Sequence, residues 1–256
     1  MNYISTTSIL GVRVSAITYV DALREIGWWI EEKKRKYVCV AATHLVMECQ
    51  KDTNLLEGVN GAGLVTPDGM PLAWLLKLYG HKNVERVYGP TFMLKTCQLA
   101  EKKGYNVFLL GGCSGQSRQL RQKLKKRFLA IQIVGCLDTP TRPIRENDNQ
   151  TTIKKINQSG AKIVFVGMGC PYQEKWMIEN REELKAPVLI GVGAAFDFLS
   201  GLQRQAPEWM QNVGLEWLYR LIQEPKRLWY RYTVINARFL FLVVGEVFRK
   251  KFLLRP

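Results

Sequence analysis

The chain has 256 residues, of which 47% are hydrophobic and 23% are charged, and this balance excludes a globally disordered protein. Its formal net charge of +15 is high for a globular chain and predicts an anionic partner or surface. The six cysteines form no Cys-x-x-Cys pair, and His44 and His81 are the only histidines. We therefore expect a reduced compartment, with no disulfide framework and no metal site.

Short apolar segments alternate with helical patterns over roughly the first 200 residues. Strands are expected at residues 37–41, 63–66, 106–110, 161–165 and 187–190, with a further candidate at 131–134. This alternation predicts an α/β fold with a Rossmann-like parallel sheet flanked by helices. The ligands of such sheets gather where the strands end. The polar stretch 139–152 is expected to be an exposed connection.

Asp68 follows the expected strand 63–66, within Pro67-Asp68-Gly69. A carboxylate in such a turn commonly caps a helix or closes the turn itself. At the edge of a ligand pocket it would instead serve as a general base that takes a proton from a hydroxyl group. Arg86, shortly before an expected helix, has two comparable interpretations, as a surface cation or as a phosphate or acceptor contact.

Three glycine-rich loops follow other expected strands, and they contain Gly111 and Gly112, Gly167 and Gly169, and Gly191 and Gly193. A strand that ends at glycines and opens a helix exposes backbone N–H groups, which favour an anion such as a phosphate. Gln173 and Glu174 lie in the helical turn after the second loop, where Glu174 is equally well explained as a helix-capping charge. Asp197, inside an apolar run, is more typical of a buried capping group than of a catalyst.

The composition changes after residue 201, and the remainder is expected to form a helical, basic appendage. From Trp217 onward nine Lys and Arg residues oppose two Glu residues, a net charge of +7. Arginines interleaved with aromatic rings suit single-stranded nucleic acid or the interface of an anionic membrane. The six consecutive apolar residues 239–244 favour the membrane, and a helix buried between copies of the chain is left open.

Several segments resemble, in chain order from about Ile9 to Tyr232, the WecG/TagA/CpsF family of bacterial glycosyltransferases. They are Thr66-Pro67-Asp68-Gly69-Met70-Pro71, Arg86-Val87-Tyr88-Gly89-Pro90, Phe108-Leu109-Leu110-Gly111-Gly112, Val166-Gly167-Met168-Gly169-Cys170-Pro171-Tyr172-Gln173-Glu174, Gly191-Val192-Gly193-Ala194-Ala195-Phe196-Asp197, Arg204-Gln205-Ala206-Pro207-Glu208-Trp209 and Gly214-Leu215-Glu216-Trp217-Leu218-Tyr219-Arg220. Each segment is unspecific alone, whereas the ordered set is highly specific.

The resemblance implies an inverting transfer of a sugar, N-acetylmannosamine-like or another hexose, from a UDP-sugar. The implied acceptor is a hydroxyl group of an undecaprenyl-diphosphate-linked saccharide used in cell-surface polysaccharide synthesis. It further implies a catalytic domain over residues 1–200 and an appendage over 201–256 that closes the active site and meets the membrane. The protein would be cytoplasmic and peripherally attached to the inner face of the plasma membrane, with no cofactor.

The resemblance also assigns roles to residues, with Asp68 as the base and Arg86 and Gln173 at positions associated with substrate binding. Tail arginines are expected near the diphosphate or leaving group, and here they are Arg220, Arg227 and Arg231. With the loops at the strand ends, the expected substrate-binding set is Thr43, Arg86, Gly111, Gly112, Gly167, Gly169, Gln173, Glu174, Gly191, Gly193 and Asp197.

The chain departs from the family pattern at three places. It has Thr43 but lacks the asparagine of a Thr-x-Asn element, Thr91 replaces the usual acid after Gly-Pro, and Tyr230 stands where an arginine is common.

Two rival functions come from the fold class and from the charge. The first is a nucleotide-dependent Rossmann oxidoreductase, although no Gly-x-Gly-x-x-Gly opens the first strand–helix unit. The second is a basic nucleic-acid-binding protein. We favour the transferase over both, and therefore expect no nucleic acid partner. Whether the chain forms a homo-oligomer is left open.

Overall fold

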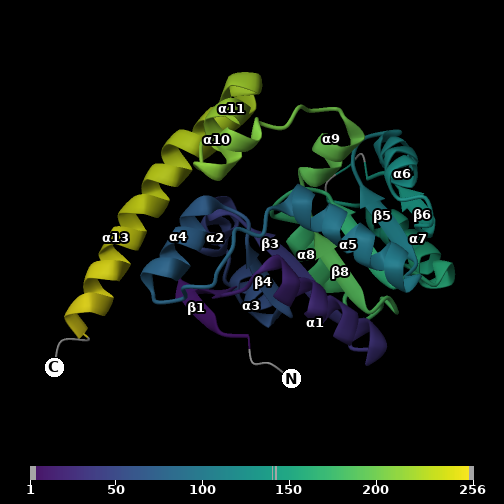
Figure 1. Cartoon of the computed structure of the whole chain (residues 1–256), viewed down its shortest axis with the longest axis horizontal. Helices are drawn as coiled ribbons and strands as arrows, with labels where there is room; N and C mark the ends of the chain where they lie inside the picture. Colours follow the sequence, from purple (N-terminus) through teal and green to yellow (C-terminus); the bar gives the residue numbers. More distant parts are fainter. Residues whose placement is uncertain (1–3, 140, 142, 254–256) are drawn as a thin grey trace.

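The computed structural model describes residues 4–139, 141 and 143–253. Arg255, one of the nine cations counted in the basic tail, lies outside the described residues, as does Pro140 of the expected connection. The polypeptide forms an α/β core followed by a helical appendage (Figure 1).

The core is built on a six-stranded sheet in which all neighbouring strands are parallel. Its order is β4-β3-β8-β7-β5-β6, with β3 at Lys36–Ala41, β4 at Leu64–Pro67, β5 at Val107–Gly111, β6 at Ile133–Leu137, β7 at Ile163–Gly167 and β8 at Val188–Gly191. Each strand overlaps an expected one, so the Rossmann-like parallel sheet is confirmed. The apolar composition of these strands fits a sheet buried on both faces.

Alternate residues of each strand face opposite layers of helices. Along β7, Ile163 and Phe165 join one apolar cluster, and Val164 and Val166 join the other. The first cluster is completed by helices α1 (Tyr19–Glu31), α5 (Gly89–Lys103), α6 (Gln116–Arg127) and α9 (Ala195–Ser200). The second is completed by α2 (Thr43–Cys49), α3 (Thr53–Gly61), α4 (Met70–Leu78), α7 (Glu146–Ser159) and α8 (Tyr172–Asn180).

Two parts of the core differ from the expectation. An antiparallel hairpin of β1 (Thr6–Ile9) and β2 (Val12–Ser15) precedes α1, and neither the hairpin nor that helix was predicted. The stretch 139–152, expected to be a connection, is helical from Glu146 onward. The apolar side chains that bury α7, Ile153 and Ile156, come after this stretch, so its polar first turns resemble a loop.

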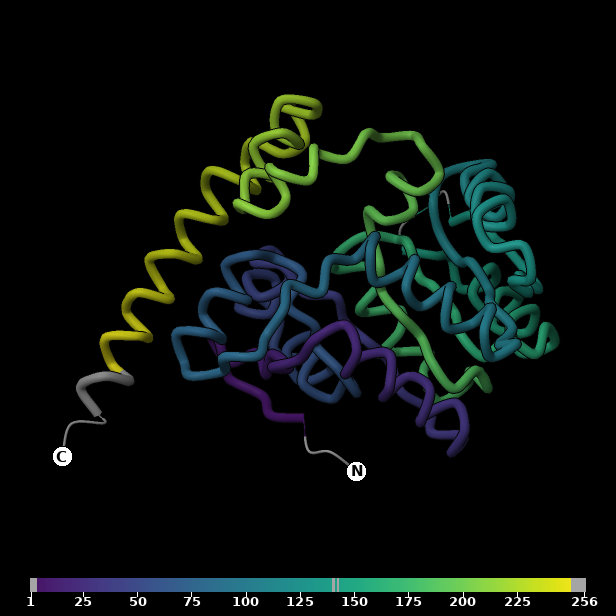
Figure 2. Tube along the Cα trace, viewed as in Figure 1, coloured from purple at the N-terminus to yellow at the C-terminus, as the bar shows by residue number. Residues whose placement is uncertain are grey.

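The appendage is helical, as predicted. It consists of α10 (Glu208–Asn212), α11 (Glu216–Gln223), α12 (Pro225–Tyr230), a π-helical turn (Arg231–Ile235) and α13 (Asn236–Leu253). Figure 2 follows the chain from α9 along an open segment to α10 and α11, and then down the long helix α13. Phe239 and Val243 of α13 belong to the apolar cluster that contains α2, α4 and the hairpin. The domain boundary at residue 200 stays a prediction.

Within the described residues, no helix is both long enough and apolar enough to cross a membrane.

Candidate active site

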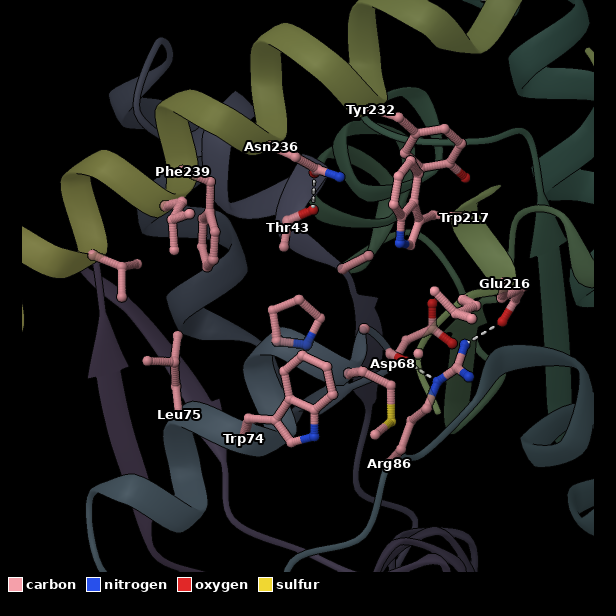
Figure 3. A pocket seen from close by; sticks show the side chains of 18 of the residues that line it. Thr43, Asp68, Trp74, Leu75, Arg86, Glu216, Trp217, Tyr232, Asn236 and Phe239 are labelled. Carbon is pink, nitrogen blue, oxygen red and sulfur yellow. Dashed lines mark hydrogen bonds and ion pairs between the residues drawn. The ribbon is translucent and has the colours of Figure 1, made fainter. Parts of the chain in front are cut away.

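Two cavities adjoin at the carboxyl edge of the sheet. The larger, of about 560 Å³, lies between α4 of the core and α11 and α13 of the appendage (Figure 3). The smaller, of about 230 Å³, lies over the ends of β7 and β8. Five residues line both: Ala42, Asp68, Glu216, Arg220 and Arg231. These five residues form a wall common to both cavities.

Asp68 is held in this wall with one carboxylate oxygen fixed. The backbone N–H of Gly89 donates to its Oδ1 at 2.8 Å, and its own N–H donates to the carbonyl of Ala41 at 2.8 Å. Asp68 Oδ2 accepts no hydrogen bond from any described residue. Burial raises the pKa of the Asp68 carboxyl above its usual range, although the Arg86 guanidinium opposes the rise. Asp68 is therefore a positioned carboxylate with one oxygen left for a substrate proton.

Arg86 does not point its guanidinium freely into the site. Its Nε donates to the backbone carbonyl of Asp68 at 2.5 Å and its Nη2 to Glu216 Oε2 at 2.5 Å. Glu216 also accepts a hydrogen bond from the Tyr88 hydroxyl at 3.0 Å, and the Arg86 guanidinium lies 4.3 Å from the centre of the Tyr88 ring. This cluster joins the strand-end loops of the core to α11, and it holds the Asp68 backbone in place.

Gln173 forms part of the wall of the smaller cavity. Its Oε1 accepts from the Gly169 N–H at 3.2 Å, and its Nε2 donates to Glu174 Oε1 at 2.7 Å. An amide has two N–H donors, so one remains for a ligand. Gly167, Gly193 and Asp197 line the same cavity. The Asp197 carboxylate is half-buried and accepts from Gln116 Nε2 at 2.8 Å.

Three glycines of the predicted set do not line either cavity. Gly111 and Gly112 end β5, which β7 separates from β8 and β3. A Cβ on Gly111, whose φ is +136°, would lie 2.6 Å from the Gly167 carbonyl carbon, so its role is close packing of two strand ends. A Cβ on Gly191 would lie 2.8 Å from Met177 Cε. Direct substrate contact does not fit these positions.

Glu174 is also placed behind the cavity wall. Its side chain is fully buried, and its Oε2 has no hydrogen-bond partner within the described chain. Burial raises the pKa of the Glu174 carboxyl to about 7, despite the hydrogen bond from Gln173. Glu174 thus supports Gln173, and contact with a substrate, which the sequence predicted, does not fit this position.

The three tail arginines of the predicted site meet at the smaller cavity. Arg227 pairs with Glu224, the residue that precedes its helix α12. Arg220 and Arg231 form no ion pair with any described residue, and Arg220 Nε is buried without a hydrogen-bond partner there. Burial lowers the pKa of Arg231 from its usual value. Guanidinium groups that lose water without gaining a carboxylate favour an anionic ligand.

Thr43 lines the larger cavity, and its hydroxyl donates to Asn236 Oδ1 at 2.8 Å. Neither Asn236 nor Glu216 is among the site residues predicted from the sequence. Glu216 lies in a segment that resembles the family, and this was the available signal for it. Nothing near Asn236 in the sequence indicates its position, because its partner Thr43 is 193 residues away.

Among the described residues, no group of three or more His, Cys, Asp or Glu side chains is arranged to hold a metal ion.

The fold is a Rossmann-like α/β core with a helical appendage, and comparison with known proteins defines the class as glycosyltransferase. The chain belongs to the glycosyl transferase WecG/TagA/CpsF family, whose profile matches residues 7–252. The predicted family is confirmed, which sets aside the oxidoreductase and nucleic-acid-binding alternatives. One relative is the N-acetylglucosaminyldiphosphoundecaprenol N-acetyl-beta-D-mannosaminyltransferase of Bacillus subtilis (strain 168). It is 26% identical over 245 residues, covering 96% of this chain and 93% of that protein.

Replacing Glu216 with Ala should loosen the appendage while the sheet stays folded, because Arg86 loses its carboxylate in a largely buried position. We expect amide hydrogen exchange in residues 206–253 to accelerate by roughly 10–10³-fold, with β3, β7 and β8 unchanged. Glu224→Ala is the matched control, since Glu224 pairs with Arg227 inside the appendage. Equal exchange rates in the two variants would contradict the docking role of Glu216.

Replacing Glu174 with Gln should remove a pH dependence of stability. The folded state raises the pKa of Glu174 from 4.5 to about 7, so the stability contributed by the protonated carboxyl is lost as the pH rises through that range. Between pH 4.5 and 8 we expect the wild type to lose on the order of 3 kcal/mol relative to Glu174→Gln, measured by urea denaturation. The control, Glu179→Gln, changes an exposed acid of the same helix. A constant difference between wild type and Glu174→Gln across this range would refute the assignment.

Proposed function

We propose that the protein transfers a sugar from a UDP-sugar to a hydroxyl group of a polyprenyl-diphosphate-linked saccharide, with inversion at the anomeric carbon. The observation that carries this proposal is the position of Asp68 in the wall shared by two cavities of different character. The family is one of glycosyltransferases, and the printed name of the Bacillus subtilis relative describes a transfer to a diphosphoundecaprenol-linked sugar.

The smaller cavity is assigned to the UDP-sugar. Its wall contains polar groups and the guanidinium groups of Arg220, Arg227 and Arg231, which suit a diphosphate. As the bond between the anomeric carbon and the diphosphate oxygen breaks, these cations stabilise the negative charge that develops on UDP. The spare N–H of Gln173 is available to the nucleotide or the sugar.

Asp68 acts on the acceptor in this proposal. The acceptor oxygen attacks the anomeric carbon from the face opposite UDP, and its proton passes to Asp68 Oδ2. One C–O bond forms, one C–O bond breaks, and UDP leaves with the electron pair. A single displacement of this kind inverts the anomeric centre. The raised pKa of Asp68 brings its basicity closer to neutral pH.

The appendage is assigned to the inner face of the plasma membrane, where a polyprenyl acceptor resides. Its surface exposes large apolar side chains, among them Trp209, Ile222, Trp229, Phe241 and Phe248. Nine of the cations of the chain follow Trp217. Exposed aromatic and aliphatic groups beside cations suit an anionic lipid surface, with the protein attached peripherally.

Replacing Asp68 with Asn should lower turnover by roughly 10²–10⁴-fold while UDP binding, measured by calorimetry, is retained. Because the base must be ionised, kcat/KM of the wild type should fall as the pH drops through the raised pKa of Asp68, above the usual range of an aspartate. The residual activity of Asp68→Asn should lack this acidic limb. Asp148→Asn, at an exposed position of α7, should behave as wild type. Undiminished turnover in Asp68→Asn would rule out the base.

Replacing Phe241 and Phe248 with Ser should weaken binding to vesicles that contain phosphatidylglycerol. These exposed side chains are seven residues apart and therefore share one face of α13. Loss of their burial in lipid should reduce vesicle co-sedimentation by roughly 10-fold or more. Leu129→Ser is the matched control, since Leu129 is 90% exposed and lies in the α/β core, outside the appendage. If both variants bind as the wild type does, the outer face of α13 does not meet the membrane.

A further inference from the structure

We propose that the larger cavity, between α4 and α13, holds the first isoprene units of the acceptor's polyprenyl chain. This inference rests on the proposed function and names the place of a part of the substrate which that function leaves unassigned. It commits to one occupant, a hydrocarbon chain joined to a diphosphate.

The lining of the cavity changes from polar to apolar along its length. Figure 3 shows Asp68, Arg86 and Glu216 together on one side, and Trp74, Leu75 and Phe239 away from them. The apolar part is formed by two helices that face each other across the cavity. Trp74, Leu75 and Leu78 come from α4, and Phe239, Leu240 and Val243 come from α13.

This apolar lining is unusually accessible for a protein interior. Trp74 is 52% exposed, Leu78 58% and Leu240 63%, although all three line one cavity. Contiguous exposed apolar groups mark binding sites, and a volume of about 560 Å³ is in the range of ligand pockets. A hydrocarbon that entered the cavity would remove this surface from water.

Charge decides which apolar ligand the cavity fits. Arg220 and Arg231 line it as well as the smaller cavity, and within the described chain neither is neutralised by a carboxylate. The order of groups is therefore Asp68 and the two guanidinium groups first, and the apolar helices beyond them. A prenyl-diphosphate-linked saccharide has the same order, namely hydroxyl, diphosphate and hydrocarbon. Arg227 lines the smaller cavity but not the larger one, so Arg220 and Arg231 are the cations placed to meet the acceptor's diphosphate as well as that of UDP.

Two contacts hold the appendage against the core beside the cavity. The Thr43 hydroxyl binds Asn236 Oδ1 at the start of α13. The φ of +80° at Gly214 lets the loop before α11 pass close to the Trp74 ring, where a Cβ would lie 3.1 Å from Trp74 Cη2. The first contact fixes α13 relative to α2, and the second holds the loop before α11 against α4, so the position of the appendage beside the cavity is set by the fold.

The test compares Leu240→Asp with Phe241→Asp in the full-length protein. Leu240 lines the cavity, whereas its neighbour Phe241 is 79% exposed and does not. Binding of geranylgeranyl diphosphate is measured by calorimetry, without membranes. A carboxylate in the path of the chain should weaken this binding roughly 10- to 100-fold in Leu240→Asp. Phe241→Asp should bind as the wild type does. Both positions are exposed, and circular dichroism verifies that each variant is folded.

Transfer is then measured in detergent with acceptors that share the saccharide and diphosphate and carry one or four isoprene units. The wild type should prefer the longer chain in kcat/KM, and Leu240→Asp should lose that preference. The cavity assignment is overturned if transfer occurs at the same rate with both chain lengths, and if Leu240→Asp changes neither transfer nor geranylgeranyl diphosphate binding. In that case the proposed function stands. If Leu240→Asp alone weakens geranylgeranyl diphosphate binding but no UDP-sugar supports transfer, the proposed function fails and the hydrocarbon site is supported.

Discussion

The ion pair between Arg86 and Glu216 is the constraint on which the site depends. It lies in a largely buried position, and it links a loop at the sheet edge to a helix 130 residues later. A buried charge is tolerated only when an opposite charge is paired with it. Displacing α11 would therefore leave the Arg86 guanidinium of the core without its carboxylate partner. The same guanidinium holds the backbone carbonyl of Asp68. Arg86 therefore connects the docked appendage to the backbone of Asp68, and Arg220 lies on the same docked helix α11.

Strand order decides which loops can share that site. The ends of β4, β3, β8 and β7 are consecutive along the sheet, and they bring Asp68, Thr43, Gly193 and Gln173 to two adjoining cavities. The end of β5 lies one strand further, and β7 stands in between. Gly111 at the end of β5 accordingly serves contact between backbones, since a Cβ there would collide with Gly167, and a Cβ on Gly112 would collide with the Gln116 side chain. A glycine-rich loop after a parallel strand is thus a ligand site only when its strand has the right neighbours.

The sequence predicts what local pattern and chain order determine. The parallel sheet is predicted by short apolar segments. The position of Asp68 at the edge of a pocket is predicted by its place directly after one of these strands. Contacts between residues far apart in the sequence are not predicted by local pattern. In the sequence Glu216 is an ordinary acid in the first turn of a helix, and only the fold places it beside Arg86. Glu174 shows the same limit, since its buried setting depends on packing of α8 against the sheet. The hairpin is not predicted because its strands, Thr6–Ile9 and Val12–Ser15, contain polar residues and lack the continuous apolar run by which the sheet strands are predicted.

The absence of the Thr-x-Asn asparagine has a structural counterpart in the appendage. Asn236, at the start of α13, brings an amide to Thr43 from the opposite side of the larger cavity. The carboxylate partner of Arg86, the two unpaired arginines and this amide all come from residues after 201. The core supplies Asp68, Arg86, Thr43 and the polar wall around Gln173. A site completed in this way is assembled only while the appendage is docked, and α13 lines the cavity with one face while exposing Phe241 and Phe248 on another. In the proposed function, the lipid surface would therefore hold in place the helix that closes the acceptor cavity.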